Sequence, residues 1–395
     1  MIFSAQRAST CSNGLRYKPA ATAASHHCQP PLSATTNGGR RSSSDTGLNR
    51  TEPDSLKTSS KSTMQSSSHL FPVALISAER RGDLTEDVYR LKPGNSPDFT
   101  VEIAVTRLGR VAAPDARGVP VVLLHGSFSN RRFWYSPKGI GLGAYLAREG
   151  FDVWIAEMRG HGLSARNSAY ASNCVADYAR FDLPAIAAFV REQTGQAPHW
   201  VGHSLGGTTL AAALGGQTLT ADDAASVAIF GSQVTRSHWP LKVPPLQWLA
   251  RLTLKRFEHV SGPRFKRGPE DEPMGVILES MRWHGLFGRF GDKKDNWWSG
   301  LAQVTVPLLA VAAVGDHQDP EWACRELFDQ FGAPDKSFLV LGRDHGFSED
   351  FDHVQMLVSK AAQTQVWPRV ADWLNRHAAA AKTESTLNMM ATPQL

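Results

Sequence analysis

Cysteine is scarce in this chain of 395 residues, and long hydrophobic runs are absent. The four cysteines, Cys11, Cys28, Cys174 and Cys324, form no C-x-x-C pair and are too scattered for a disulfide framework, so we expect reduced thiols. A membrane-spanning helix needs about 18 consecutive apolar residues. One of the longest apolar runs here covers only residues 306–314, so the sequence predicts no integral membrane segment.

The first 70 residues lack an apolar stretch after Met1, and no acidic residue occurs before Asp45. They are rich in Ser and Thr and show no apolar periodicity. Such a segment cannot offset the entropy of ordering, so we predict a disordered basic tail over residues 1–70, and a second disordered tail over residues 381–395. The tail lacks the apolar segment of a secretory signal peptide, so a cytoplasmic or organellar location is favoured over secretion. Its composition fits both a transit peptide and an extension before an internal start at Met64.

The excess of positive charge is confined to the same tail. The net charge of the chain is +5, and residues 1–70 hold eight basic and three acidic side chains, whereas the remaining 325 residues hold 34 of each. A nucleic-acid partner is indicated by basic charge gathered on a folded domain. Because the rest of the chain is balanced, we expect no nucleic-acid partner.

From about residue 72, short apolar runs alternate with helical patterns. The predicted strands are residues 99–105, 119–124, 152–156, 199–201, 226–230, 306–314 and 337–341, and the predicted helices lie near 138–149, 177–194, 205–215, 320–331 and 365–378. Near-continuous Val, Ile and Leu runs are typical of strands buried on both faces of a parallel sheet. The alternation therefore predicts one doubly wound α/β domain with a mostly parallel sheet, over residues 71–380.

One interval, about residues 232–303, interrupts this alternation. A structureless loop of that length is uncommon, so we predict an inserted helical cap. One of its helices is expected to carry apolar residues near one face, namely Leu246, Leu249, Leu252 and Phe257, and a second is expected over residues 274–284. The cap is expected to pack on the main domain, with a lid that also touches lipid as the alternative. Its tryptophans are predicted to wall an apolar pocket: Trp239, Trp248, Trp283, Trp297 and Trp298.

The sequence G-x-S-x-G occurs at residues 202–206, with Ser204 between a short predicted strand and a predicted helix. Glycine on both sides permits the sharp strand-to-helix turn that lifts a serine side chain above the edge of a sheet. The N–H groups at the start of the following helix point towards a developing negative charge. Ser204 is therefore the candidate nucleophile.

A serine nucleophile needs a base that an acid holds in place, in the chain order Ser, acid, His, each in a loop after a strand. His345 directly follows the last predicted strand and is the candidate base, whereas His353 is expected on a helix. Asp316 and Asp319 both follow the strand at residues 306–314. Because Asp319 precedes a proline and suits the cap of a helix, Asp316 is the candidate acid and Asp319 the alternative.

The tetrahedral intermediate also needs two N–H donors for its oxyanion. Leu205, directly after the serine, is one candidate; Ser127 is the other, with Phe128 as its alternative. His125, in the same loop as Ser127, is expected to brace that loop rather than to catalyse. This chemistry requires no cofactor. The acidic cluster at 316–319 lacks further metal-ligand spacing, so no metal is expected either.

Several of these motifs occur together in one known superfamily. His125-Gly126, Arg159-Gly160-His161-Gly162-x-Ser164, the turn at 202–207, Asp316 and His345 resemble the α/β-hydrolase superfamily over about residues 75–378. Within it, residues 145–204 are similar to the acid lipases of gastric and lysosomal type. The shared patterns lie at residues 150–154, 159–160, 178–185 and 194–196. Leu205 departs from the glutamine that those lipases usually place after the serine.

The resemblance implies a hydrolase fold, and with the candidate residues it predicts a serine hydrolase that cleaves carboxylic esters, lipid esters among them, through an acyl-enzyme. Other serine acyl chemistry, as in a thioesterase, peptidase or acyltransferase, would use the same residues and stays open. A ligand-binding homologue without turnover is a further alternative. The expected partner is thus a small-molecule ester or lipid, and the sequence gives no indication of the oligomeric state.

Overall fold

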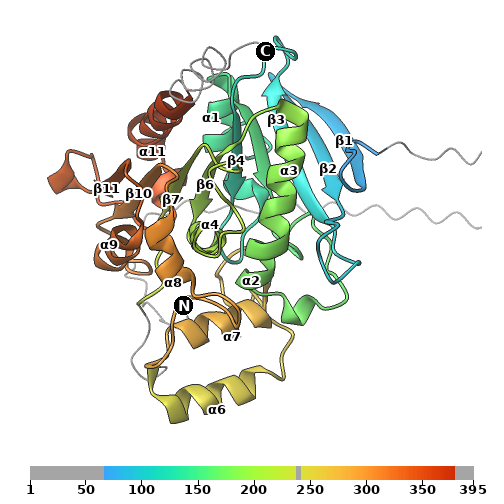
Figure 1. Ribbon diagram of the computed structural model, residues 1–395. Helices are drawn as coiled ribbons and strands as arrows, with labels where there is room; N and C mark the ends of the chain where they lie inside the picture. Colours follow the sequence, from blue (N-terminus) through green and yellow to red (C-terminus); the bar gives the residue numbers. More distant parts are fainter. Residues whose placement is uncertain (1–65, 237–241, 379–395) are drawn as a thin grey trace, which may run out of the picture. The chain divides into compact units, whose positions relative to one another are not determined.

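The described residues build a nine-stranded sheet in the order β1-β2-β3-β5-β4-β6-β7-β10-β11, which runs through the centre of the protein (Figure 1). The computed structural model describes residues 66–236 and 242–378. The predicted tails lie outside the described residues, except for residues 66–70. These five residues are anchored, because the His69 N–H donates to Glu192 Oε1 at 2.7 Å.

The sheet has an antiparallel edge and a parallel body. The strands are β1 (Val73–Arg81), β2 (Leu84–Leu91), β3 (Ile103–Arg110), β4 (Pro120–Leu124), β5 (Asp152–Ala156), β6 (His199–His203), β7 (Ser226–Phe230), β10 (Leu308–Ala313) and β11 (Lys336–Leu341). From β5 across to β11 all neighbours pair in parallel, whereas β1, β2, β3 and β5 pair antiparallel. Every residue of β4, β5, β6, β7 and β10 is buried, which confirms the predicted fold class.

The helices outside the insertion include the predicted ones, most of them with shifted ends, and two short helices over residues 355–358 and 360–365 that were not predicted. They are α1 (Leu142–Arg148), α2 (Val175–Asp177), a π-helical turn (Tyr178–Asp182), α3 (Leu183–Thr194), α4 (Leu205–Gly215), α9 (Glu321–Gln330), α10 (Gln355–Val358), α11 (Lys360–Gln365) and a helix over residues 367–378. Pro184 lies where the π-helical turn passes directly into α3, and Gly195 ends that helix in the left-handed conformation.

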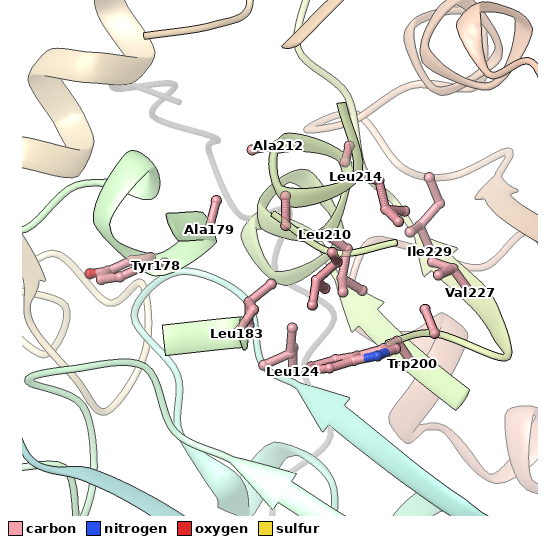
Figure 2. Packing of buried hydrophobic residues seen from close by; sticks show 14 of the residues in the cluster. Leu124, Tyr178, Ala179, Leu183, Trp200, Leu210, Ala212, Leu214, Val227 and Ile229 are labelled. Atoms are coloured by element: carbon pink, nitrogen blue, oxygen red, sulfur yellow. The ribbon is translucent and has the colours of Figure 1, made fainter. Parts of the chain in front are cut away.

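Helix α4 lies at the centre of the packing, between the sheet and its neighbouring helices. All of its residues are buried, so it is apolar on every side rather than amphipathic. Figure 2 shows Leu210 and Leu214 of this helix among Leu124, Trp200 and Ile229 of the sheet, with Leu183 of α3 close by. A helix packed this completely fixes the position of its first residues, which lie next to Ser204.

An insertion, residues 231–307 between β7 and β10, carries α6 (Pro244–Leu254), a two-stranded ribbon of β8 (His259–Val260) and β9 (Glu272–Pro273), α7 (Met274–Trp283) and α8 (Trp297–Gly300). The expected helix at 274–284 is thus present. The cap was expected to pack on the main domain. The apolar face of α6 does not do so, because none of the residues of α6 is buried. In Figure 1, α7 lies between α6 and the sheet.

Two of the tryptophans that were predicted to wall a pocket are core residues. Trp283 and Trp297 are buried with Phe290 in an edge-to-face aromatic cluster, and the backbone of Trp297 packs on Gly215. Gly215 is the last residue of α4, whereas Ser204 precedes the first residue of that helix. These side chains therefore belong to the core, while Trp248 is exposed and Trp239 lies outside the described residues.

Candidate active site

Ser204 occupies a strained turn between β6 and α4. Its φ of 52° and ψ of −117° are unusual for a residue with a side chain, and its N–H donates to the Phe230 carbonyl at 2.8 Å. The flanking backbone leaves no room for side chains: a Cβ on Gly206 would lie 2.5 Å from the Leu124 carbonyl oxygen. The sequence pattern thus produces the sharp turn because only glycine fits beside it.

Asp319 lies directly against the serine. The Ser204 hydroxyl is 3.4 Å from Asp319 Oδ2, and Gln233 Nε2 donates to Asp319 Oδ1 at 3.0 Å. The expected role of Asp319 as a helix cap is not observed. The N-cap residue of α9 is Pro320, and no side chain forms a capping hydrogen bond there. The Asp319 carboxylate instead turns inward and is buried.

Asp316 pairs with His353. His353 Nδ1 donates to Asp316 Oδ2 at 2.7 Å, and the same nitrogen is 3.8 Å from Asp319 Oδ2. The other carboxylate oxygen of Asp316, Oδ1, accepts the N–H groups of Gln318 and Asp319 at 2.9 Å each, which fixes the side chain. Asp319 Oδ2 therefore has the serine hydroxyl on one side and the His353 ring on the other.

His345, the histidine that the sequence pairs with Asp316, lies elsewhere. It is exposed, in a short 3₁₀ turn over residues 343–345 directly after β11. The chain then returns to the end of β10, where the Gly315 N–H donates to the Phe351 carbonyl at 2.9 Å. This contact brings His353, two residues later, against Asp316. The pairing of His345 with Asp316 that was predicted from its place after the last strand is thus not present in this structure, where His353 is the partner of Asp316.

The sequence carries a signal for His353 that points away from a helical position. Asp352 Oδ1 accepts the N–H groups of Val354 and Gln355, at 2.9 and 2.7 Å, in the turn that precedes α10. An Asp before an apolar helical pattern is a typical capping residue. Residue 353 could thus have been placed in the turn before the helix, although not next to Asp316.

The charges around His353 favour its protonated form. Burial lowers the pKa of this histidine, but the hydrogen bond to Asp316 and the charge of Asp319 outweigh that effect, so its pKa is raised above the ordinary 6.5. Burial also raises the pKa of Asp319; His353 opposes this shift and the charge of Asp316 adds to it. His203 Nε2 donates to the His353 carbonyl at 2.8 Å, and burial followed by the charge of His353 keeps the pKa of His203 well below its usual range.

The insertion contacts the loop after β4 through both backbone polar groups of Phe128. Phe128 has a left-handed φ of 60°; its N–H donates to Glu272 Oε2 at 2.9 Å and its carbonyl accepts the Glu270 N–H at 3.0 Å. A Cβ on Gly268 would lie 2.1 Å from the same carbonyl oxygen, so the two backbones touch. The N–H of Phe128, the alternative oxyanion donor, is thus occupied, whereas the structure gives the Ser127 N–H no acceptor among the described residues.

His125 is a neutral brace within this loop. Its Nδ1 donates to the Gly126 carbonyl at 2.8 Å and its Nε2 accepts the Met158 N–H at 3.2 Å. Burial, with the nearby charge of His161, lowers the pKa of His125 to about 3. A neutral imidazole ring has one nitrogen that donates and one that accepts a hydrogen bond. The lowered pKa of His125 and its two hydrogen bonds therefore agree.

The motif around Arg159 is structural. Arg159 Nε donates to Asp182 Oδ2 at 2.9 Å, and both side chains are buried. Ser164 connects the loop after β5 to β3, because its hydroxyl donates to the Glu157 carbonyl at 2.7 Å and accepts the Ala104 N–H at 2.8 Å. These residues hold the loop after β5 and do not reach Ser204.

Comparison with known proteins agrees with this fold and with the predicted resemblance. The family model described as alpha/beta hydrolase fold matches residues 119–241. Triacylglycerol lipase 2 of Arabidopsis thaliana is 31% identical over 149 residues, which are 36% of this chain and 33% of that protein. Human gastric triacylglycerol lipase is 33% identical over 136 residues, 32% of this chain and 31% of that protein. A thermophilic esterase from Thermogutta terrifontis has 16% identity and a TM-score of 0.48, over 73% of this chain and 98% of that one.

Residues 119–241 of the chain thus match the α/β-hydrolase fold family, and the chain is similar to lipases over part of their length. The matched region contains β4, β6, the turn at Ser204 and α4, and ends within the insertion. The chain spans about a third of the length of the curated relatives that it matches, 33% and 31% for the two lipases above. No helix of the described residues has the length and apolarity needed to cross a membrane.

Proposed function

We propose that the protein is a serine hydrolase that cleaves carboxylic esters through an acyl-enzyme, with Ser204 as nucleophile, His353 as base and Asp316 as its acid. The observation that carries this proposal is the arrangement of the buried Asp316–His353 pair, 2.7 Å apart, beside the Asp319 oxygen that contacts the strained Ser204. A nucleophile, a base and an orienting acid within one buried cluster are what acyl transfer requires.

In this mechanism His353 acts through Nε2, because Nδ1 is bound to Asp316. Nε2 takes the Ser204 proton as Oγ bonds to the ester carbonyl carbon, and Asp316 stabilises the imidazolium. The proton then passes to the departing alkoxide as its C–O bond breaks, which leaves the acyl-enzyme. Water repeats these steps with His353 as base and releases the acid.

The oxyanion donors in this proposal are the N–H groups of Leu205 and Ser127. Leu205 begins α4, so its N–H has no partner within the helix and lies at the positive end of the helix dipole. Gly126 brings the second loop close, since a Cβ there would lie 3.0 Å from Ser204 Cβ. Support for Ser127 over Phe128 comes from Glu272, which already accepts the Phe128 N–H.

The substrate class in this proposal is a carboxylic ester with an apolar acyl group. Its support is the similarity to two proteins named triacylglycerol lipases, at 31% and 33% identity over part of their length. Thioester, peptide and acyl-transfer chemistry would use the same cluster, and no residue described here favours them over an ester.

A fluorophosphonate probe tests the proposed chemistry directly. We expect it to label Ser204 in the wild-type protein, because an activated serine hydroxyl displaces the leaving group on phosphorus. Peptide mapping by mass spectrometry locates the adduct, and Ser204→Ala is the matched control. A folded wild-type protein that resists labelling while retaining ligand binding would instead support a non-catalytic homologue.

The pH profile tests the base and its environment. His353 must be unprotonated to accept the serine proton, so kcat/KM should rise with pH, with a midpoint above 6.5 because its neighbours raise the pKa of His353. Asp319→Asn removes one of the charges that raise this pKa. We therefore expect the midpoint to move to lower pH in this variant, measured with a soluble short-chain ester. A variant that is slower at every pH with an unmoved midpoint would show that Asp319 acts only in packing.

A further inference from the structure

Helix α6 presents its apolar side to solvent. Residues 247, 250, 251 and 254 have the spacing of a core-facing stripe, and they are the half-buried positions, occupied by Gln247, Ala250, Arg251 and Leu254. Gln247 contacts the Met281 carbonyl of α7. The opposite side carries Leu246, Leu249, Leu252 and Trp248, all exposed, with Trp248 at 67%. This is the reverse of the usual arrangement in a helix that ends at water.

The exposed apolar surface extends beyond the helix. The Leu286 N–H donates to the Lys242 carbonyl at 3.0 Å, which ties the loop after α7 to the residues before α6. Leu286 and its neighbour Phe287 are both exposed, Phe287 at 87%. Contiguous apolar side chains of this size on a surface mark a contact with another phase or partner.

The same region is strongly basic. Residues 242–267 contain seven Lys or Arg side chains and one acidic side chain, Glu258. Five of the seven are exposed and form no ion pair with a described residue: Lys255, Arg256, Arg264, Lys266 and Arg267. The surface that α6 offers is therefore apolar in the middle and positively charged beside it.

Charge discriminates between the candidate occupants. A second copy in a symmetric contact would bring this basic surface against itself. Residues 1–65 of the chain carry eight basic and three acidic side chains, so they have the same sign as α6. An anionic bilayer satisfies both parts, because Leu and Trp enter the boundary of head groups and acyl chains while Lys and Arg meet the lipid phosphates.

We propose that α6 and the segment up to Arg267 form a docking surface for an anionic phospholipid membrane. The surface determines where the protein resides and is separate from the bond-breaking chemistry proposed above. Its cations attract the protein to the bilayer, and Trp248 and the exposed leucines hold it there. Because exposed side chains carry this binding, it can be removed without disturbing the core.

Co-sedimentation with vesicles tests the proposal, using full-length protein with Ser204→Ala so that no lipid is hydrolysed. Binding is expected to vesicles containing about a third phosphatidylglycerol and to be at least about tenfold weaker to phosphatidylcholine alone. Binding to the phosphatidylglycerol vesicles should weaken at about 1 M salt, where charges are screened beyond about 3 Å. Equal binding to the two vesicles would overturn the proposal.

Two pairs of variants localise the binding. Trp248→Ser and the double variant Lys255→Glu, Arg256→Glu should each lower the partition coefficient about tenfold or more. Their matched controls are Trp322→Ser, which alters an exposed tryptophan of α9, and Lys138→Glu with Lys360→Glu, which changes the net charge equally; both should bind as before. If the controls lose binding to the same extent, the attraction is a property of net charge and not of α6.

Two further measurements keep the outcome decisive. In protein with Ser204 intact, the α6 variants should hydrolyse a soluble ester at the wild-type rate. If Trp248→Ser is unstable, Leu252→Ser replaces it as the variant of the apolar face. Light scattering measures the oligomeric state. A dimer that Trp248→Ser dissociates would show that a second copy covers α6, and would overturn the membrane assignment. Loss of ester hydrolysis with vesicle binding retained would count against the proposed function alone.

Discussion

Replacing His353 with alanine is expected to lower kcat/KM by about 10⁴-fold, because the serine then has no base to accept its proton. Replacing His345 with alanine should leave kcat/KM within about twofold of the wild-type value, since that side chain is exposed and lies outside the Asp316 cluster. The two variants are assayed side by side on a soluble p-nitrophenyl ester. They show whether the base is His353, which the structure pairs with Asp316, or His345, which the order of residues along the chain predicts.

Loss of the buried His353 could also disturb the loop that carries it. Thermal unfolding of both variants separates this effect from catalysis, and His353→Gln retains most of the volume of the ring. The opposite pattern, with His345→Ala inactive and His353→Ala active, would mean that the loop after β11 rearranges to bring His345 to Ser204.

Replacing Ser204 with alanine is expected to lower kcat by about 10⁴-fold or more, because no group remains to form the acyl-enzyme. A residual rate above that in water should persist, since the Leu205 and Ser127 N–H groups would still stabilise charge on the carbonyl oxygen. The measurement is turnover of a short p-nitrophenyl ester with protein that unfolds at the wild-type temperature. Wild-type turnover by folded Ser204→Ala protein would rule out the proposed mechanism.

The parallel body of the sheet could be predicted from the sequence because most of its strands are fully buried and are rich in apolar residues. The hairpin of β1 and β2 could not. Most residues of β1 are exposed or half-buried, so its sequence has little periodicity to detect. The predicted strand over residues 99–105 also began too early, since Phe99 is exposed and β3 starts at Ile103.

The site could be predicted in part, to the extent that it depends on local chain geometry. The turn at Ser204 follows from glycines that no other residue can replace, and Asp316 follows a buried strand directly. The position of His353 depends instead on how a loop of twelve residues, 342–353, closes onto β10 through Gly315 and Phe351. Only the tertiary fold determines that closure. The inward turn of Asp319 is likewise decided by Gln233 and Ser204, which lie far away in the sequence.

The hydrogen bonds of the Phe128 N–H and carbonyl limit how this protein can be recombined with its relatives. A chimera that exchanges residues 231–307 would replace Glu272, whose side chain accepts the Phe128 N–H, and the backbone segment whose N–H at residue 270 donates to the Phe128 carbonyl. The buried N–H would then lack an acceptor, at a cost of about 1–3 kcal/mol, next to a proposed oxyanion donor. Transplanted specificity therefore requires junctions that keep residues 268–272 with the loop that they contact.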